Sequence, residues 1–124
     1  NFLSSIKDHY QNLIVVFGCG GDRDKSKRSL MLKAALKSSS KVIFTSDNSR
    51  SEDFENIFID AAKDNNIDNV VKIKDRKKAI IYASEILSQK ECLVILGKGH
   101  EETQEENNKT SFFSDHEVIN EIYK

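Results

Sequence analysis

The chain has no nucleotide-binding P-loop. The pattern G-x-x-x-x-G-K-[ST] occurs nowhere in its 124 residues. The turn Gly18-x-Gly20-Gly21 also lacks the third glycine of the dinucleotide fingerprint G-x-G-x-x-G. A glycine-rich loop that cradles ATP is therefore excluded for this chain alone. The amides of this turn and the start of the helix that follows could still hold an anion.

Charge excess, long apolar runs and paired cysteines are also missing. The formal net charge of -1 argues against a partner that is nucleic acid or a membrane surface. No apolar run approaches the roughly 18 residues of a membrane span, and no signal-peptide pattern is present, so we expect a cytoplasmic protein. Cys19 and Cys92 have neither C-x-x-C spacing nor clustered histidines, which argues against a metal site and favours buried thiols.

What the chain does contain is an alternation of strand and helix patterns. Its length suits one domain, and we expect residues 13–124 to form it, with residues 1–12 as a linker or the tail of a preceding helix. Apolar runs predict strands at 13–17, 42–45, 70–73 and 92–96, and helical spacing predicts helices at 26–37, 52–65, 75–89 and 114–123. This order predicts an α/β fold, a Rossmann-like, doubly wound and mostly parallel sheet flanked by helices.

Several local signals refine this prediction. Ser26, Ser51 or Asp53, and Ser114 are candidate helix caps. The pair Asn107-Asn108 predicts the turn of an antiparallel hairpin at an edge of the sheet near the C-terminus. The inward faces of two helices are expected to carry, respectively, Leu30, Met31, Ala34 and Ala35, and Ala79, Ile80, Ala83, Ile86 and Leu87.

Charged loops follow three of the predicted strands, after Phe17, Thr45 and Leu96. Parallel strands end at the same edge of a sheet, where open α/β sheets bind their ligands, so these loops predict one shared site. The alternative is a set of solvated turns. The site would be lined by donors for an anion (Arg23, Arg50 and Lys98) and by acceptors for an ammonium group (Asp47 and Glu101). Both signs together suit a zwitterion such as an amino acid.

Three motifs carry a resemblance to a known family. They are Gly18-Cys19-Gly20-Gly21-Asp22-Arg23-Asp24-Lys25, Asp47-Asn48-Ser49-Arg50 and Gly97-Lys98-Gly99-His100-Glu101. In this order and spacing they resemble the C-terminal domain of the Mur ligases, and most closely the members that add the third residue of the peptidoglycan stem peptide. The resemblance runs from about Leu13 to the end of the chain.

The resemblance implies the C-terminal domain of a three-domain, ATP-dependent and ADP-forming amide ligase. The N-terminal domain would hold UDP-N-acetylmuramoyl-dipeptide, and the central domain would hold ATP and Mg²⁺. This domain would deliver the incoming amino acid, expected to be meso-diaminopimelate, and close over the ATP. It implies no catalytic residue and no metal ligand in this chain, which by itself should be inactive.

Residue by residue, the resemblance implies that the incoming amino acid is held by Arg23, Asp47, Asn48, Ser49, Arg50, Gly97 and Glu101. Arg50 would pair with the distal carboxylate of diaminopimelate, which lysine lacks. Ser49 stands where the family motif has proline, a departure that loosens the loop but keeps the arginine. Asp22 and Lys25 would face the ATP phosphates after closure. His100 is expected to orient its loop rather than act as a base.

Two other readings stay open at this point. One is a lysine-adding ligase or another member of the superfamily, of the folate polyglutamate or cyanophycin synthetase type. The other is a free-standing, anion-binding doubly wound domain. Because the first residue is Asn1 and not methionine, we expect the sequence to be a piece of a longer protein.

Overall fold

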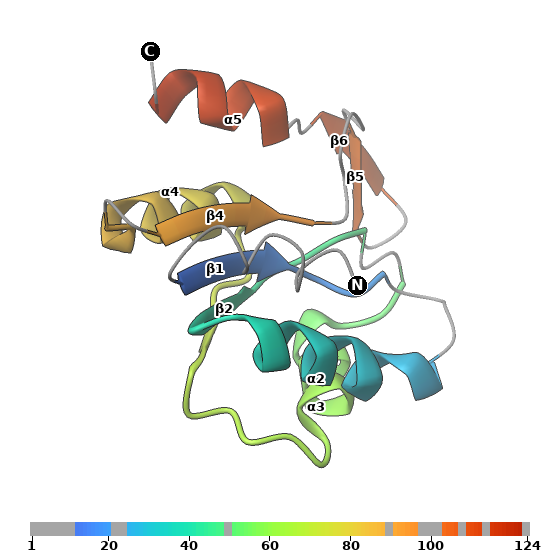
Figure 1. The fold of residues 1–124 in the computed structure, drawn as a ribbon. Helices are drawn as coiled ribbons and strands as arrows, with labels where there is room; N and C mark the ends of the chain where they lie inside the picture. Colours follow the sequence, from blue (N-terminus) through green and yellow to red (C-terminus); the bar gives the residue numbers. More distant parts are fainter. Residues whose placement is uncertain are drawn as a thin grey trace.

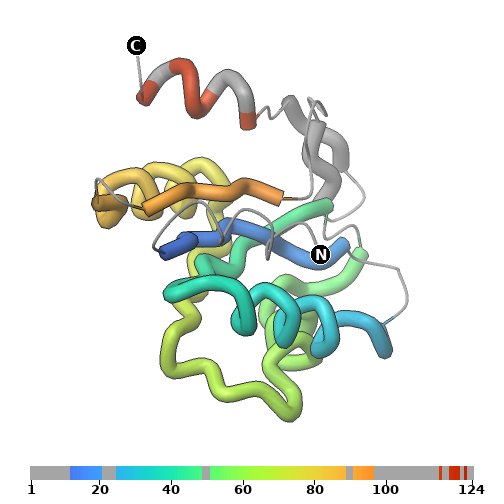
Figure 2. Tube along the Cα trace, in the orientation of Figure 1, coloured from blue at the N-terminus to red at the C-terminus, as the bar shows by residue number. Residues whose placement is uncertain are grey.

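A four-stranded parallel sheet forms the centre of the computed structural model, which describes residues 12–20, 25–48, 51–88, 91–96, 103–106, 109–112 and 115–122 (Figures 1 and 2). Its strands are β1 (Asn12–Phe17), β2 (Lys41–Phe44), β3 (Val70–Lys72) and β4 (Glu91–Ile95). They lie in the order β3-β2-β1-β4, and all three neighbouring pairs are parallel. The parallel sheet predicted from the sequence is confirmed.

Helices cover both faces of this sheet, as predicted (Figure 1). The helix α2 (Arg28–Ser38), which continues a short 3-10 turn η1 (Lys25–Lys27), packs with α3 (Phe54–Ala62) on one face. The other face is covered by α4 (Arg76–Ile86) and α5 (Asp115–Ile122). This arrangement gives a doubly wound fold.

The central strand β1 supplies both layers of the core. Successive side chains of a strand point to opposite faces. Leu13, Val15 and Phe17 accordingly pack toward α2 and α3, whereas Ile14 and Val16 pack toward α4 and α5. All five are buried. The unbroken apolar run in the sequence therefore reflects a strand that is covered on both sides.

The ends of the helices differ in detail from the sequence prediction. Ser26 is not the cap of the helix predicted at 26–37. The turn η1 precedes α2, and the N-cap of α2 is Lys27, which makes no side-chain cap bond. The prediction of a helix to residue 65 is also wrong. The helix α3 ends at Ala62 because Lys63, with a ψ of 128°, leaves the helical conformation and Asp64 has a φ of 62°. Asp53 is the N-cap of α3, without a side-chain cap bond.

The inward face of α2 also differs from the prediction. Ala35 is buried as predicted, but Leu30 and Met31 are exposed, at 63% and 47%, and Leu32 is buried together with Arg28 and Ser38. The predicted inward face of α4 is confirmed, since Ala79, Ile80 and Ala83 are fully buried. Asp75 caps α4 by accepting a hydrogen bond from the amide of Lys78 at 3.1 Å.

The predicted hairpin near the C-terminus exists, but it is not an edge of the main sheet. The strands β5 (Thr103–Glu106) and β6 (Lys109–Phe112) pair with each other in a separate antiparallel sheet. The sequence of β5 is entirely polar, so it has no apolar face with which to extend the core layers. Its predicted turn, Asn107-Asn108, lies outside the described residues, as do Ser114 and residues 1–11.

Candidate functional site

The carboxyl ends of β1, β2 and β4 lie side by side, as the three charged loops of the sequence predict. The ladder continues beyond the strands: the amide of Thr45 donates to the carbonyl of Phe17 at 3.0 Å, and the amide of Leu96 donates to the carbonyl of Val16 at 2.8 Å. These bonds hold the first residues after β2 and β4 against β1. The edge at which the sequence predicts a site is therefore formed by the ends of three hydrogen-bonded strands of one sheet.

Gly18, the first residue after β1, allows the loops to approach this closely. A Cβ atom at this position would lie 2.1 Å from the carbonyl oxygen of Thr45 and 3.0 Å from its carbonyl carbon. Both contacts are with backbone, which cannot rotate away. A glycine is therefore required here by close packing between the ends of β1 and β2.

The segment that leaves β2 is fixed before it reaches the predicted binding residues. Thr45 and Ser46 are buried. The Thr45 hydroxyl and the Ser46 amide both donate to the carbonyl of Lys74, at 3.1 and 3.3 Å. Asp47 and Asn48 follow directly and are half-buried. Asn48 has a φ of 50°, a left-handed conformation that asparagine tolerates better than most residues. These two side chains thus project from a well-anchored backbone.

A first buried arginine, Arg28, ties the loop after β1 to α3. Its guanidinium pairs with Glu52, with contacts of 2.6 and 3.1 Å, and with Asp60 at 2.9 Å, and it donates to the carbonyl of Gly20 at 3.1 Å. Hydrogen bonding to Glu52 raises the pKa of Arg28 above its usual value. Arg28 thus remains a cation and holds the glycine turn in place.

A second buried arginine, Arg76, lies on the other face of the sheet. Its Nε and one terminal nitrogen form a bidentate pair with Asp115, at 2.8 and 2.9 Å. The terminal nitrogens also donate to the carbonyl of Ser46 at 3.2 Å and to the carbonyl of Leu96 at 2.9 Å. One guanidinium therefore joins the end of β2, the end of β4 and the start of α5.

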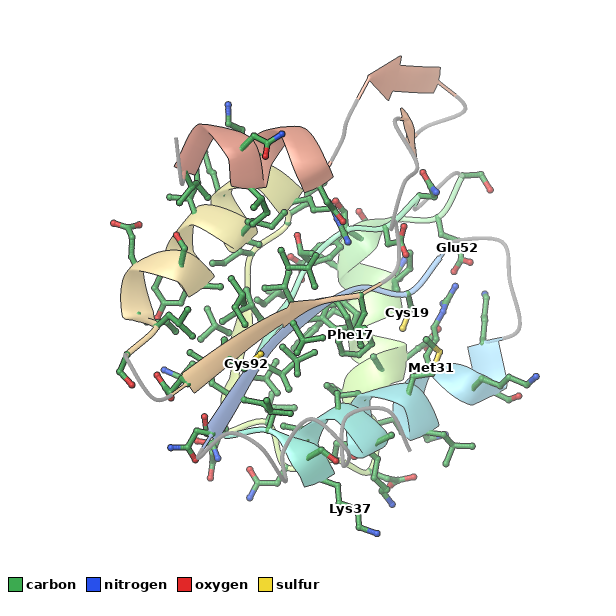
Figure 3. The ribbon with its side chains drawn as sticks, turned by 45° about the horizontal axis from the view of Figure 1, so that its top comes forward. Phe17, Cys19, Met31, Lys37, Glu52 and Cys92 are labelled. Carbon is green, nitrogen blue, oxygen red and sulfur yellow. The ribbon has the colours of Figure 1, made fainter. Side chains whose placement is uncertain are left out.

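Cys19, the second residue after β1, is buried near the charged groups of Arg28 and Asp47. Burial raises the pKa of its thiol to about 11, partly opposed by the nearby cation of Arg28 and reinforced by the anion of Asp47. Figure 3 shows Cys19 on the side of Phe17 that faces Glu52, whereas Cys92 lies on the opposite side. Both thiols are free. The prediction of buried thiols is confirmed for Cys19, while Cys92 is half-buried.

Among the residues predicted to hold a ligand, the structure describes three. Asp47 and Asn48 lie at the carboxyl edge of the sheet, and Lys25 lies in η1, 66% exposed, with its Nζ 3.8 Å from Glu52. Lys25 also borders an open pocket of about 540 Å³ lined by acidic and polar residues of α3 and of the turn before it. The other predicted residues lie outside the described residues: Asp22, Arg23, Ser49, Arg50, Gly97, Lys98, His100 and Glu101.

The sequence interpretation missed the two buried arginines. A signal for Arg76 was present, because it stands three and four residues before Ala79 and Ile80 and thus on the same face of α4. Arg28 stands four and seven residues before Leu32 and Ala35, and thus also on the same helix face as they do. An arginine on the buried stripe of an amphipathic helix predicts a buried carboxylate or carbonyl partner. Which partner it is cannot be read from this spacing.

With this geometry in place, comparison with known proteins identifies the family. Residues 1–99 match the family described as "Mur ligase, glutamate ligase domain". The chain belongs to this family. The resemblance noted in the sequence is thereby confirmed for the Mur ligase domain as a whole.

Two relatives and one solved structure that resemble this Mur ligase domain carry the same enzyme name. The UDP-N-acetylmuramoyl-L-alanyl-D-glutamate--2,6-diaminopimelate ligases of Helicobacter pylori and Chlorobium phaeobacteroides are 49% and 44% identical, over 91% and 94% of the chain. A solved structure with the same enzyme name superposes with a TM-score of 0.90 at 40% identity and covers 99% of the chain. The domain spans about a quarter of these proteins: 26% and 23% of the two relatives and 27% of the solved chain.

Neither a metal-binding cluster nor a membrane-spanning helix is present in the part of this Mur ligase domain that the structure describes. No three His, Cys, Asp or Glu side chains in that part are grouped so as to hold a metal ion. Its helices are too short or too polar to cross a bilayer.

Proposed function

We propose that the chain is the C-terminal, amino-acid-binding domain of a longer ATP-dependent and ADP-forming ligase. The ligase would add meso-diaminopimelate to UDP-N-acetylmuramoyl-L-alanyl-D-glutamate in peptidoglycan synthesis. Residues 13–124 would be the domain and residues 1–12 its link to a central domain. That central domain would hold ATP and Mg²⁺, and the N-terminal domain would hold the nucleotide substrate. The reaction would take place in the cytoplasm, which supplies ATP.

The observation that carries this proposal is the anchored Asp47-Asn48 segment beside the ends of β1 and β4. Asp47 and Asn48 supply a carboxylate and an amide on a backbone that Lys74 and Arg76 hold in place. A half-buried carboxylate is a suitable partner for the ammonium group of an amino acid. The names of relatives 40–49% identical to the chain favour diaminopimelate as that amino acid.

The remaining residues of the proposed site supply the complementary groups. Arg50 would pair with the distal carboxylate of diaminopimelate through its planar fork, and Arg23 would meet the other carboxylate. Ser49, Gly97 and Glu101 would complete the site with hydroxyl, backbone and carboxylate contacts. A guanidinium left without the distal carboxylate would be a desolvated, unpaired cation, so the site should discriminate against lysine.

In the proposed reaction, the side-chain carboxylate of D-glutamate first takes up the γ-phosphoryl group of ATP, which releases ADP. The uncharged amine of diaminopimelate then attacks the acyl carbon. A C–N bond forms, the C–O bond to phosphate breaks, inorganic phosphate leaves and the nitrogen loses one proton. This domain would orient the amine and exclude water from the acyl phosphate as it closes. Asp22 and the exposed Lys25 would then face the phosphates.

The test is an amide-forming assay on the full-length protein that carries this chain. Phosphate release would be measured with UDP-N-acetylmuramoyl-L-alanyl-D-glutamate and ATP, with meso-diaminopimelate offered against L-lysine. We expect a preference for diaminopimelate that Arg50→Ala abolishes. Arg50→Lys is the matched control, because it keeps the charge but not the bidentate fork, and should recover only part of the preference.

The other outcomes separate the readings that the sequence left open. A preference for lysine that Arg50→Ala leaves unchanged would contradict the carboxylate pairing and indicate a lysine-adding ligase. Turnover with other amino acids and no UDP-linked substrate would indicate another branch of the superfamily. Absence of turnover with every acceptor would overturn the proposed function and favour a binding domain.

A further inference from the structure

The Arg76-Asp115 pair lies directly behind the proposed amino-acid site. Arg76 is the first residue of α4, and Asp115 is the first residue of α5. They are 39 residues apart in the sequence and are both buried, at 1% and 6% exposure. Bidentate pairing between an arginine and a carboxylate fixes the plane of the guanidinium as well as its position. The guanidinium of Arg76 is therefore held in a fixed position and orientation.

The terminal nitrogens of Arg76 also donate to two backbone carbonyls. The carbonyl of Ser46 belongs to the peptide group whose nitrogen is that of Asp47, and the carbonyl of Leu96 belongs to the peptide group whose nitrogen is that of Gly97. Each carbonyl thus lies in the peptide that leads into a residue of the proposed site. Fixing a carbonyl fixes its whole peptide plane.

The strands that Arg76 connects are not neighbours. In the sheet order β3-β2-β1-β4, β2 and β4 lie on either side of β1, so no strand hydrogen bond joins them directly. Arg76 connects their ends across the end of β1. The separation of the two loops is therefore set by a side chain, in addition to the ladder bonds that each strand makes with β1.

We propose that Arg76, held by Asp115, is a positioning residue for the incoming amino acid. It would hold the Asp47-Asn48 segment in a fixed position relative to the end of β4 at Leu96, and so keep its carboxylate and amide aligned for the amino acid. Arg76 would not touch the substrate. The inference rests on the proposed function, because the amino acid is the ligand of that same site.

The kinetic test uses the full-length enzyme and the variants Arg76→Lys and Asp115→Asn. Lysine supplies one point charge in place of a fork, so it cannot reach the carboxylate and both carbonyls in the same geometry. The KM for the amino acid should rise at least about tenfold, because misplacement of binding groups by about 1 Å costs up to ~100-fold. The KM values for ATP and for the nucleotide substrate should stay near those of the wild type, and kcat should fall less than kcat/KM.

Leu13→Ala is the matched control. Leu13 is fully buried at the opposite end of β1, where it pairs in register with Cys92 of β4. This variant lowers the stability of the same sheet without a change at its carboxyl edge. If Leu13→Ala raises the KM for the amino acid as much as Arg76→Lys does, the role of Arg76 is general stability and the inference is overturned.

Amide hydrogen exchange tests whether Arg76 holds the segment after β2, without the need for turnover. Peptides that contain residues 45–48 should exchange faster in Arg76→Lys than in Leu13→Ala, while peptides from α3, against which Leu13 packs, should exchange faster in Leu13→Ala. Unchanged exchange at residues 45–48 overturns the inference while leaving the proposed function intact. A wild-type enzyme without turnover on any amino acid overturns both together.

Discussion

The two buried arginines, Arg28 and Arg76, lie on opposite faces of the same sheet and differ in how exposed their carboxylate partners are. Arg28 faces α3 and the turn before it, where the side chains of its partners Asp60 and Glu52 are 39% and 15% exposed. Arg76 faces α5, where the side chain of its partner Asp115 is only 8% exposed. The Nε of Arg28 is buried without a partner among the described residues, whereas the Nε of Arg76 donates to Asp115. Only Arg76 has each of its three nitrogens bonded.

The difference shows how a buried charge can serve two purposes in one fold. Arg28 ties one loop to one helix through carboxylates that water can reach, so the pair behaves much like a partly exposed ion pair. Arg76 joins two strand ends and a helix in a site closed to water. A guanidinium with several buried acceptors specifies geometry, and its removal leaves those acceptors and a carboxylate unpaired.

The largest effect should come from replacing each arginine with methionine, which keeps much of the length but removes the charge. Arg76→Met should cost about 3–5 kcal/mol of the free energy of unfolding, because Asp115 would be left buried and unpaired. Arg28→Met should cost about 1–3 kcal/mol, since Glu52 and Asp60 can turn to water. Urea unfolding of the chain measures both. Equal costs would show that the two sites do not differ in solvent access.

A third contact at this edge of the sheet involves no charge: Gly18 packs against the backbone of Thr45. Gly18→Ala should destabilise the fold by about 1–3 kcal/mol, because the new methyl group would overlap the Thr45 carbonyl and force the ends of β1 and β2 apart. The loss should appear as a lower urea midpoint with an unchanged m-value. A neutral result would mean that the loops after β1 and β2 can separate without cost, which would weaken the case for a rigid edge.

The segment after β2 that Arg76 holds contains one left-handed residue, Asn48. Its replacement should lower the free energy of unfolding by less than Gly18→Ala does. Asn48→Ala should lose about 1 kcal/mol, because an L-residue with an ordinary Cβ is disfavoured at a φ of 50°. Asn48→Gly should keep this stability yet lose the side-chain amide. Comparison of thermal unfolding with amino-acid binding in the two variants separates backbone strain from ligand contact. Equal stability of both variants would argue against the left-handed conformation.

The smallest effect concerns the thiol beside Arg28. Because burial raises the pKa of Cys19 to about 11, the folded chain keeps this proton at a pH where the unfolded chain releases it. Stability should therefore decline as the pH rises from about 9 toward 11. Iodoacetamide should modify Cys92 before Cys19, as followed by mass spectrometry. In Arg28→Met the pKa of Cys19 should rise further, since the cation that lowers it is gone; a fall would contradict this assignment.

The elements of the fold could be predicted from the sequence to within a few residues. The four parallel strands and the main helices follow from local periodicity, and the gathering of Phe17, Thr45 and Leu96 at one edge follows from parallel connections. The predicted inward face of α2 was right for Ala35 but wrong for Leu30 and Met31, which are exposed. The apolar residues are spread around this helix, so the local pattern does not select Leu32 over Leu30 and Met31.

Of the candidate site, the sequence predicted the residue types and the edge but not what holds them. Asp47 and Asn48 stand next to one another in a motif that can be recognised in the chain. The anchors of that motif come from elsewhere: Lys74 from the end of β3 and Arg76 from α4. Which carbonyl accepts a side-chain hydrogen bond depends on the path of the backbone, so the acceptor cannot be identified from residue type and spacing.

By itself, the sequence determined the alternation of strands and helices, the parallel sheet and the family, because these depend on periodicity and on short motifs read in order. Only the tertiary structure decided which arginines are buried, that Arg76 joins the ends of β2 and β4 to Asp115, and that β5 and β6 form a sheet of their own. The reason is physical. Burial and pairing are set by groups 20 to 39 residues apart that meet only when the sheet and its two layers of helices have assembled.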